Sequence, residues 1–223
     1  INKCLIDDGI FVFEDPSLLK MLERISYDQI YDEHAHVFSV TALQNLMNRN
    51  GLEIFRVENL VVHGGSNRIY ACKLGTRKVE NSVLENLSLE QEYGIQELAT
   101  YEKFAKKVAT SKDALVELLT NMKKEGRKVV SYGATSKSTT VFNYCGIGPD
   151  LIDYIVDTTE AKQGKLSPGM HIPVIPPHSG FDDTVDVAFL GAWNYKKEIL
   201  TKEEGFLRNG GRFITHIPRV RII

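Results

Sequence analysis

The densest group of side chains able to do acid–base chemistry lies between residues 27 and 36. These ten residues contain two tyrosines, three acids and two histidines. A histidine has an unperturbed pKa of about 6.5 and accepts a proton near neutral pH. A neighbouring carboxylate orients the imidazole, and a tyrosine hydroxyl donates to a developing oxyanion. Such a set suits proton abstraction beside a carbonyl, although a polar surface turn or an interdomain hydrogen-bond network has the same composition. His34 and His36 are two residues apart, the wrong spacing for two metal ligands on a helix face.

A second candidate site follows the predicted strand that ends at Tyr132. Gly133 allows a sharp turn, and a helix rich in hydroxyls then begins near Ser136. The free N–H groups and the dipole of a helix N-terminus attract anions, and Lys137 adds a point charge suited to phosphate. The segment matches neither the phosphate-binding Walker loop nor the GxGxxG pattern. An ordinary strand-to-helix turn, capped by Thr135 or Ser136, is the alternative.

A third candidate is Asp157, which follows a predicted strand over residues 151–156 and precedes a loop rich in glycine and proline. Ligands of open α/β sheets bind outside the carboxyl ends of the strands. Asp157 is therefore expected where a ribose or sugar hydroxyl is held. In the alternative interpretation, Asp157 caps a loop that is shaped by Gly164, Pro168 and Gly169.

The elements that position these residues are predicted from periodicity and turn residues. The first part reads as a strand, two helices and a hairpin, over residues 10–13, 18–22, 41–49, 53–62 and 67–74. Polar residues 75–97 are the best candidate for a linker, and apolar spacing predicts one helix from Leu98 to Met122. Strands then alternate with helices, which indicates a mostly parallel sheet. The fold class is therefore α/β, with the end of one α/β domain (residues 1–75), a linker (76–97) and a Rossmann-like domain (98–223).

Composition narrows the function further. The 223 residues carry 27 Lys and Arg against 29 Asp and Glu, a net charge of −2 that argues against a nucleic-acid partner. No apolar run approaches the roughly 20 residues that span a membrane. Three isolated cysteines fit a reducing cytoplasm. Because the sequence starts at Ile1 and reaches a strand within a few residues, we expect a fragment of a longer protein.

Several motifs together resemble the deoxysugar C-methyltransferases, which act on nucleotide-linked keto sugars. Residues 31–34 followed by Phe38 and Ser39 are similar to the Tyr-x-Glu-His…Phe-Ser motif of that family. Val37 stands where the family often has an aromatic residue, and His36 matches no family position. The remaining matches are residues 63–66, 132–134, 143–150, 162–164, 168–169, 171–173 and 192–194, together with Lys137.

The resemblance implies a parent with a small zinc-binding domain, a central S-adenosylmethionine-binding domain and a C-terminal Rossmann-like domain. Residues 1–75 would then end the central, class I methyltransferase domain. The cofactor loop would lie upstream of Ile1, and this chain would bind no metal.

By the same resemblance, His34 is the candidate base, with Glu33 and Tyr31 orienting it or the sugar. The substrate, a nucleotide-diphosphate sugar, would be bound by Tyr132, Gly133, Ser136, Lys137 and Asp157. The alternatives are a non-catalytic nucleotide-sugar-binding fragment and a sugar-nucleotide dehydrogenase or epimerase domain.

Overall fold

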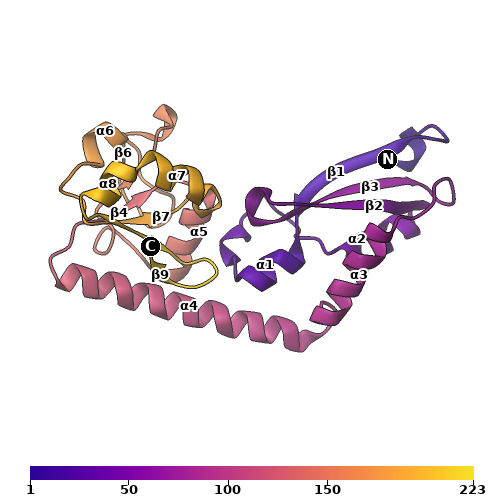
Figure 1. Ribbon diagram of the computed structural model, residues 1–223, viewed down its shortest axis with the longest axis horizontal. Coiled ribbons are helices and arrows are strands. Elements are labelled where there is room, and N and C mark those ends of the chain that lie inside the picture. The colour runs from indigo at the N-terminus through magenta and orange to yellow at the C-terminus, as the bar shows by residue number, and fades with distance from the viewer. The chain divides into compact units, whose positions relative to one another are not determined.

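The computed structural model describes residues 1–223, which form two compact units (Figure 1). The N-terminal unit comprises Ile1–Arg24 and His34–Ala105. The C-terminal unit comprises Ile25–Glu33 and Lys106–Ile223. The segment Ile25–Glu33 therefore belongs to the C-terminal unit, although the residues on both sides of it in the sequence belong to the other.

The N-terminal unit is built on a three-stranded antiparallel sheet in the order β1-β3-β2. Its elements are η1 (Asn2–Cys4), β1 (Ile10–Pro16), α1 (Leu18–Arg24), α2 (Val40–Arg49), β2 (Leu52–Leu60), η3 (Val62–Gly64), β3 (Ser66–Lys73) and α3 (Asn81–Tyr93). Helices α2 and α3 cover one face of the sheet, where alternate strand residues such as Ile54 and Ile69 pack against Leu43 and Val83. The predicted strand, helices and hairpin of this region are confirmed.

Helix α3 lies inside residues 76–97, which the sequence predicted to be a linker. The compact unit continues through these residues, so its boundary falls further along the chain, after Ala105. The apolar periodicity of α3 is weak because two of its three buried residues, Asn86 and Glu90, are polar. A composition-based reading therefore mistook a packed helix for a linker.

The C-terminal unit has a six-stranded sheet in the order β6-β5-β4-β7-β8-β9. All neighbouring strands are parallel except β8 and β9, which confirms the mostly parallel sheet. The strands are β4 (Val129–Tyr132), β5 (Ile155–Val156), β6 (Val174–Ile175), β7 (Val187–Leu190), β8 (Arg212–Thr215) and β9 (Arg221–Ile222). Several strands are shorter than predicted, and the sequence analysis missed β9.

Helices cover both faces of this sheet (Figure 1). Phe142 of α5 packs on Phe189 of β7, whereas Ile199 of α7 and Phe206 of α8 pack against the opposite face. The helical elements are η2 (Tyr27–Gln29), α4 (Leu98–Lys124), α5 (Ser136–Cys145), η4 (Glu160–Lys162), α6 (Pro177–Gly180), η5 (Trp193–Tyr195), α7 (Lys196–Lys202) and α8 (Glu204–Arg208).

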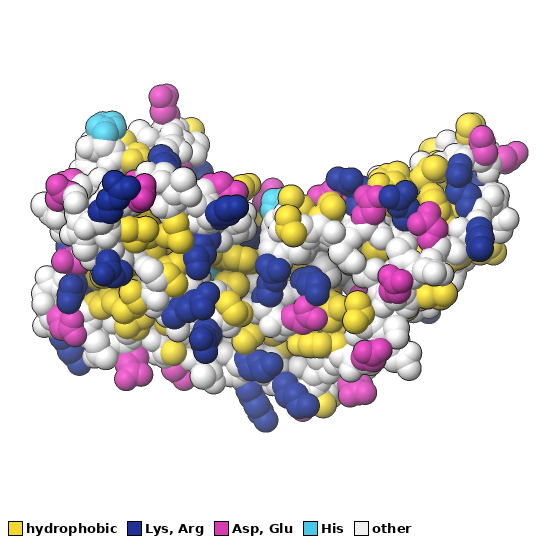
Figure 2. Space-filling view, in the orientation of Figure 1, with side chains coloured by type: hydrophobic (Ala, Val, Ile, Leu, Met, Phe, Trp, Pro, Cys, Tyr) yellow, Lys and Arg dark blue, Asp and Glu magenta, His cyan; other side chains and the backbone are white.

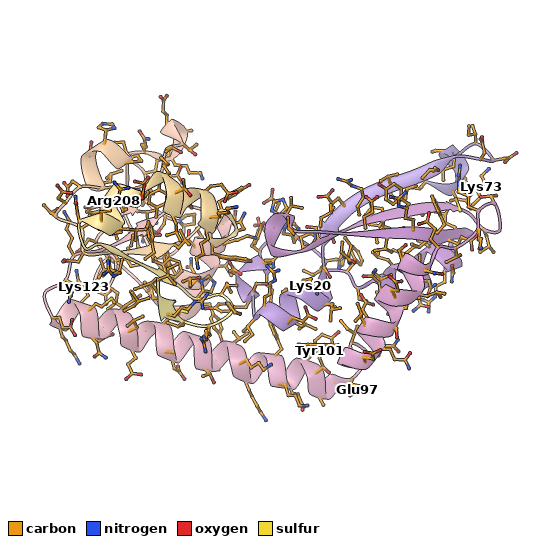
Figure 3. All side chains as sticks on the ribbon, viewed as in Figure 1. Lys20, Lys73, Glu97, Tyr101, Lys123 and Arg208 are labelled. Carbon is orange, nitrogen blue, oxygen red and sulfur yellow. The ribbon has the colours of Figure 1, made fainter.

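The long helix predicted from residue 98 is confirmed as α4, but its apolar face begins later than expected. Leu98 is 74% exposed, and burial starts at Val108. Tyr101 uses its hydroxyl to donate to the carbonyl of Ile95 at 2.6 Å and keeps its ring at the surface (Figure 3). At the other end, Lys123 pairs with Asp153 at 2.8 Å.

Basic and acidic side chains are interspersed over the visible face of the molecule (Figure 2). None of the helices combines the length and apolarity that crossing a membrane requires.

Helix α3 is held to the start of α2 by a buried carboxylate. Glu90, only 1% exposed, accepts the N–H groups of Val40 (2.7 Å) and Thr41 (2.8 Å) and the hydroxyl of Thr41 (2.6 Å). A negative charge at a helix N-terminus also complements the helix dipole.

We therefore predict that Glu90→Gln lowers the free energy of unfolding of the N-terminal unit by about 1.5–3 kcal/mol, because an amide turns a donor toward buried N–H groups. Urea unfolding followed by circular dichroism measures the change. Glu85→Gln, at an exposed position of α3, is the control and should stay within about 0.5 kcal/mol of wild type. Equal effects of the two substitutions would show that the Glu90 charge does not stabilise this unit.

Candidate functional site

The candidate site is organised by the turn that joins β4 to α5. Strand β4 is the point at which the strand order of the sheet reverses. Strand β4 lies between β5 and β7, so connections leave it toward both edges of the sheet. Gly133 adopts a φ of +98°, which favours glycine. Thr135 caps α5 by accepting the N–H of Ser138 at 3.0 Å, and it donates to the carbonyl of Gly191 at 2.8 Å. The predicted strand–turn–helix is confirmed, and pockets lie on either side of it.

The first pocket has a volume of about 550 Å³ and lies beside the first turns of α5. Residues from three stretches of the C-terminal unit line it: the 25–33 segment, the start of α5 and the loop after β5. They are Tyr31, Asp32, Ala134, Thr135, Ser136, Thr139, Thr140, Ala161, Lys162, Lys165, Leu166, Ser167, Pro168 and Val174. The first-turn N–H groups of α5 have no acceptor within the helix, so this end of α5 suits an anion.

Lys137 is the most unusual residue beside this pocket. It is only 6% exposed, and its ammonium has no hydrogen-bond partner. The ammonium lies 5.4 Å from the centre of the Tyr31 ring, in a cation–π contact. Burial lowers the pKa of Lys137, and the negative charges of Asp28 and Glu33 oppose this shift. A buried charge that lacks hydrogen bonds is costly, so this position favours an anionic ligand.

Tyr31 is placed to donate a proton and not to accept one. Burial, reinforced by the charges of Glu33 and Asp28, raises the pKa of Tyr31. Its hydroxyl therefore stays protonated at neutral pH. Because Tyr31 lines the first pocket, it is suited to donate a hydrogen bond to a ligand oxygen.

A second pocket of about 390 Å³ lies at the carboxyl ends of β4, β5 and β7. Tyr132, Gly133 and Asp157 line it, whereas Ser136 lines the first pocket. The structure therefore divides the predicted substrate-binding residues between two pockets. The hydroxyl of Tyr132 donates to Glu203 at 2.6 Å and accepts from Lys202 at 3.2 Å. Burial and the Glu203 carboxylate raise the pKa of Tyr132.

Asp157, which was predicted to bind a ligand hydroxyl, stabilises the turn between β4 and α5 by hydrogen bonds. Its carboxylate accepts the N–H groups of Ala134 (2.7 Å) and Thr159 (2.8 Å) and lies 3.5 Å from the ammonium of Lys162. Burial acts to raise the pKa of Asp157, but the hydrogen bonds from Thr159 and Ala134 and the charge of Lys162 outweigh burial and lower it overall. Lys162 also donates to the carbonyl of Ala134 at 2.8 Å and lines both pockets.

The candidate base, His34, belongs to the N-terminal unit, whereas Tyr31 and Glu33 belong to the C-terminal unit. Within its own unit, the Nδ1 atom of His34 lies 4.0 Å from a carboxylate oxygen of Asp15. Burial raises the pKa of Asp15, while His34 and a backbone hydrogen bond from Phe38 act to lower it. An adjacent carboxylate orients an imidazole and stabilises its protonated form.

Sequence reasoning missed three residues of this region. Asp15 is the next-to-last residue of strand β1, so its position near a strand terminus was a usable signal. Lys162 was quoted only as part of a motif, and Asp28 carried no signal because a buried acid cannot be told from an exposed one by type. No group of three or more His, Cys, Asp or Glu side chains in the structure is arranged to hold a metal ion.

Two comparisons with known proteins agree with the motifs. A family model described as the C-methyltransferase C-terminal domain matches residues 61–218. C-methyltransferase NovU of Streptomyces niveus is 37% identical over 224 residues, an alignment that covers 100% of this chain and 53% of that protein. The chain thus spans about half the length of the curated relative that it matches.

The state of Lys137 leads to a prediction about anion binding. The affinity for inorganic pyrophosphate should fall as the pH rises, starting below the pKa of about 10.4 of an exposed lysine, because a neutral amine does not attract an anion. Lys137→Met should weaken binding at pH 7 by roughly 10- to 150-fold, the equivalent of one charge-assisted contact.

Titration calorimetry between pH 7 and 10 measures both effects. Lys124→Met, which removes an exposed lysine of α4, is the control and should bind as wild type does. If Lys137→Met keeps the wild-type affinity and pH profile, Lys137 does not contact the anion.

Proposed function

Because this chain belongs to the family of C-methyltransferase C-terminal domains, we propose that it forms part of an enzyme that methylates a carbon atom of a nucleotide-diphosphate-linked keto-deoxysugar. The observation that carries the proposal is the buried Lys137 ammonium, which has no hydrogen-bond partner and lies against Tyr31 beside the first pocket. A diphosphate oxygen would give this ammonium the hydrogen-bond acceptor that it lacks. NovU is named a C-methyltransferase, which supports the same reaction class.

The first pocket is the proposed site for the nucleotide diphosphate. Lys137 supplies a buried positive charge next to Ser136 in the chain, and Ser136 lines this pocket together with Lys162 and Lys165. Ser136 brings a hydroxyl and a first-turn N–H group to the start of α5. These groups are donors, so the site accepts oxygen-rich anions and discriminates poorly between individual bases. Residues other than these must therefore select the sugar and the ring carbon that is methylated.

His34 is the proposed base. The keto group acidifies the neighbouring C–H bond, and the imidazole removes that proton to give an enolate. Asp15 holds the imidazole and stabilises its charge once the proton has been accepted. Tyr31, which stays protonated, donates to the enolate oxygen. The negative carbon of the enolate would then form the new carbon–carbon bond to the methyl group. The bond from that methyl group to the sulfur of its donor would break, with the electron pair staying on the sulfur, while the proton remains on His34.

S-adenosylmethionine is the proposed methyl donor, which supplies an electrophilic methyl group. The N-terminal unit does not fit its binding, and the strand–glycine–helix turn of the C-terminal unit is already the proposed diphosphate site. The N-terminal unit contains only antiparallel strands, and so lacks the parallel strand, glycine turn and helix that bind such cofactors. The acid of its polar pocket, Glu90, is committed to the N-terminus of α2. We therefore assign the cofactor to no residue of this chain, and we propose that residues 1–75 complete a class I methyltransferase domain.

We predict that His34→Ala in the full-length enzyme slows methyl transfer by roughly 10²- to 10⁴-fold, the usual contribution of a general base. Affinity for S-adenosylmethionine should barely change. Glu33→Gln should cost less, because the imidazole remains. His36→Ala is the control, since His36 only packs its ring against Phe38 and has no proposed role.

The deciding measurement follows deuterium from solvent into the substrate beside its carbonyl, with an unreactive cofactor analogue bound. Wild type and His36→Ala should exchange this proton, and His34→Ala should not. Undiminished exchange in His34→Ala would remove His34 as the base. Turnover of a nicotinamide cofactor by wild type would instead favour a sugar-nucleotide dehydrogenase or epimerase, and binding with no reaction would favour a non-catalytic module.

A further inference from the structure

A buried polar cluster lies in the C-terminal unit between the 25–33 segment and the ends of two strands. Its centre is Asp28, which is 0% exposed. One carboxylate oxygen, Oδ2, accepts the indole N–H of Trp193, which follows β7, and lies 3.5 Å from Nε2 of His216, which follows β8. His216 is itself 1% exposed and stacks on Phe189 of β7.

The cluster is incompletely paired. The second oxygen of Asp28, both ring nitrogens of His216 and the ammonium of Lys137 are buried without a hydrogen-bond partner. Buried polar groups in native proteins are almost always paired. The unpaired groups of this cluster therefore call for an explanation.

Asp28 connects this cluster to the first pocket in two ways. It belongs to η2, which packs against α5, the helix that carries Lys137. It also precedes Tyr31 by three residues, and the ring of Tyr31 lies over the Lys137 ammonium. The charge of Asp28 is attractive to this ammonium and opposes its loss of a proton on burial.

We propose that Asp28 is the positioning residue of the anion site. Anchored by Trp193 and His216, its buried carboxylate fixes η2 on α5, seats Tyr31 against Lys137 and keeps the Lys137 ammonium charged for the ligand. Asp28 does not touch the ligand, and it acts through Lys137. This inference rests on the proposed function, because it assigns a role within the same site.

A double-mutant cycle between Asp28 and Lys137 tests the proposal in the full-length enzyme. Asp28→Asn preserves the size of the side chain and an oxygen for Trp193 but removes the charge. Alone it should weaken thymidine diphosphate binding about 10-fold, and in a Lys137→Met background by less than about 2-fold, because neighbouring groups that act as a unit are not additive. KM for the sugar nucleotide should follow the same pattern.

Asp153→Asn is the matched control, because Asp153 is a part-buried carboxylate of the same unit that pairs with Lys123. Its effect should be the same with and without Lys137→Met. A merely structural Asp28 would behave like this control, and equal weakening by Asp28→Asn in both backgrounds would overturn the proposal. If Asp28→Asn does not fold, Trp193→Phe, which keeps the charge and removes its anchor, replaces it in the cycle with the same criterion.

The two proposals fail separately. Thymidine diphosphate affinity requires no turnover, so the cycle is informative even if no keto sugar is methylated, an outcome that would reject only the proposed reaction. Methylation by wild type combined with an additive cycle would reject only the role of Asp28.

Discussion

The buried ammonium of Lys137 is the constraint on which the C-terminal unit depends. The free-energy cost of burying a lysine ammonium must be offset by an opposite charge, by an aromatic ring or by a bound ligand. The structure supplies the ring of Tyr31 at 5.4 Å and the attractive charges of Asp28 and Glu33. All three partners come from one short segment, residues 25–33. That segment therefore packs with the C-terminal sheet instead of the residues that flank it in the sequence.

This requirement explains why the acid–base motif is divided. Tyr31 and Glu33 belong to the C-terminal unit and interact with Lys137. His34 is the first residue of the next stretch of the N-terminal unit and lies 4.0 Å from Asp15 there. The chain passes between the two units at three peptide bonds, Arg24–Ile25, Glu33–His34 and Ala105–Lys106, and the second of these divides the motif. The residues of this motif are adjacent in the sequence but lie in two different environments. One environment favours anions, and the other places a carboxylate beside an imidazole.

The sequence predicted what depends on apolar periodicity and on glycine turns. The hairpin, α2, the parallel strands and the turn from Tyr132 into α5 follow from local pattern and backbone chemistry. It did not predict α3, whose buried face includes Glu90, or the core position of Asp28, because a polar residue looks the same whether solvated or buried. For the same reason, the sequence did not show that Asp157 accepts the N–H groups of Ala134 and Thr159, and its role as a ligand stays a prediction.

The protonation states of the first pocket decide how its residues divide the chemistry. Tyr31, with its pKa raised, is a donor, and Lys162, Lys165 and the α5 N-terminus also offer only hydrogen-bond donors. Such a site stabilises negative charge, whether of a diphosphate or of an enolate, but removes no proton. Asp32 is a lining carboxylate, but it is exposed to solvent. The base that we propose, His34, lies in the N-terminal unit with its Nδ1 atom 4.0 Å from the carboxylate of Asp15.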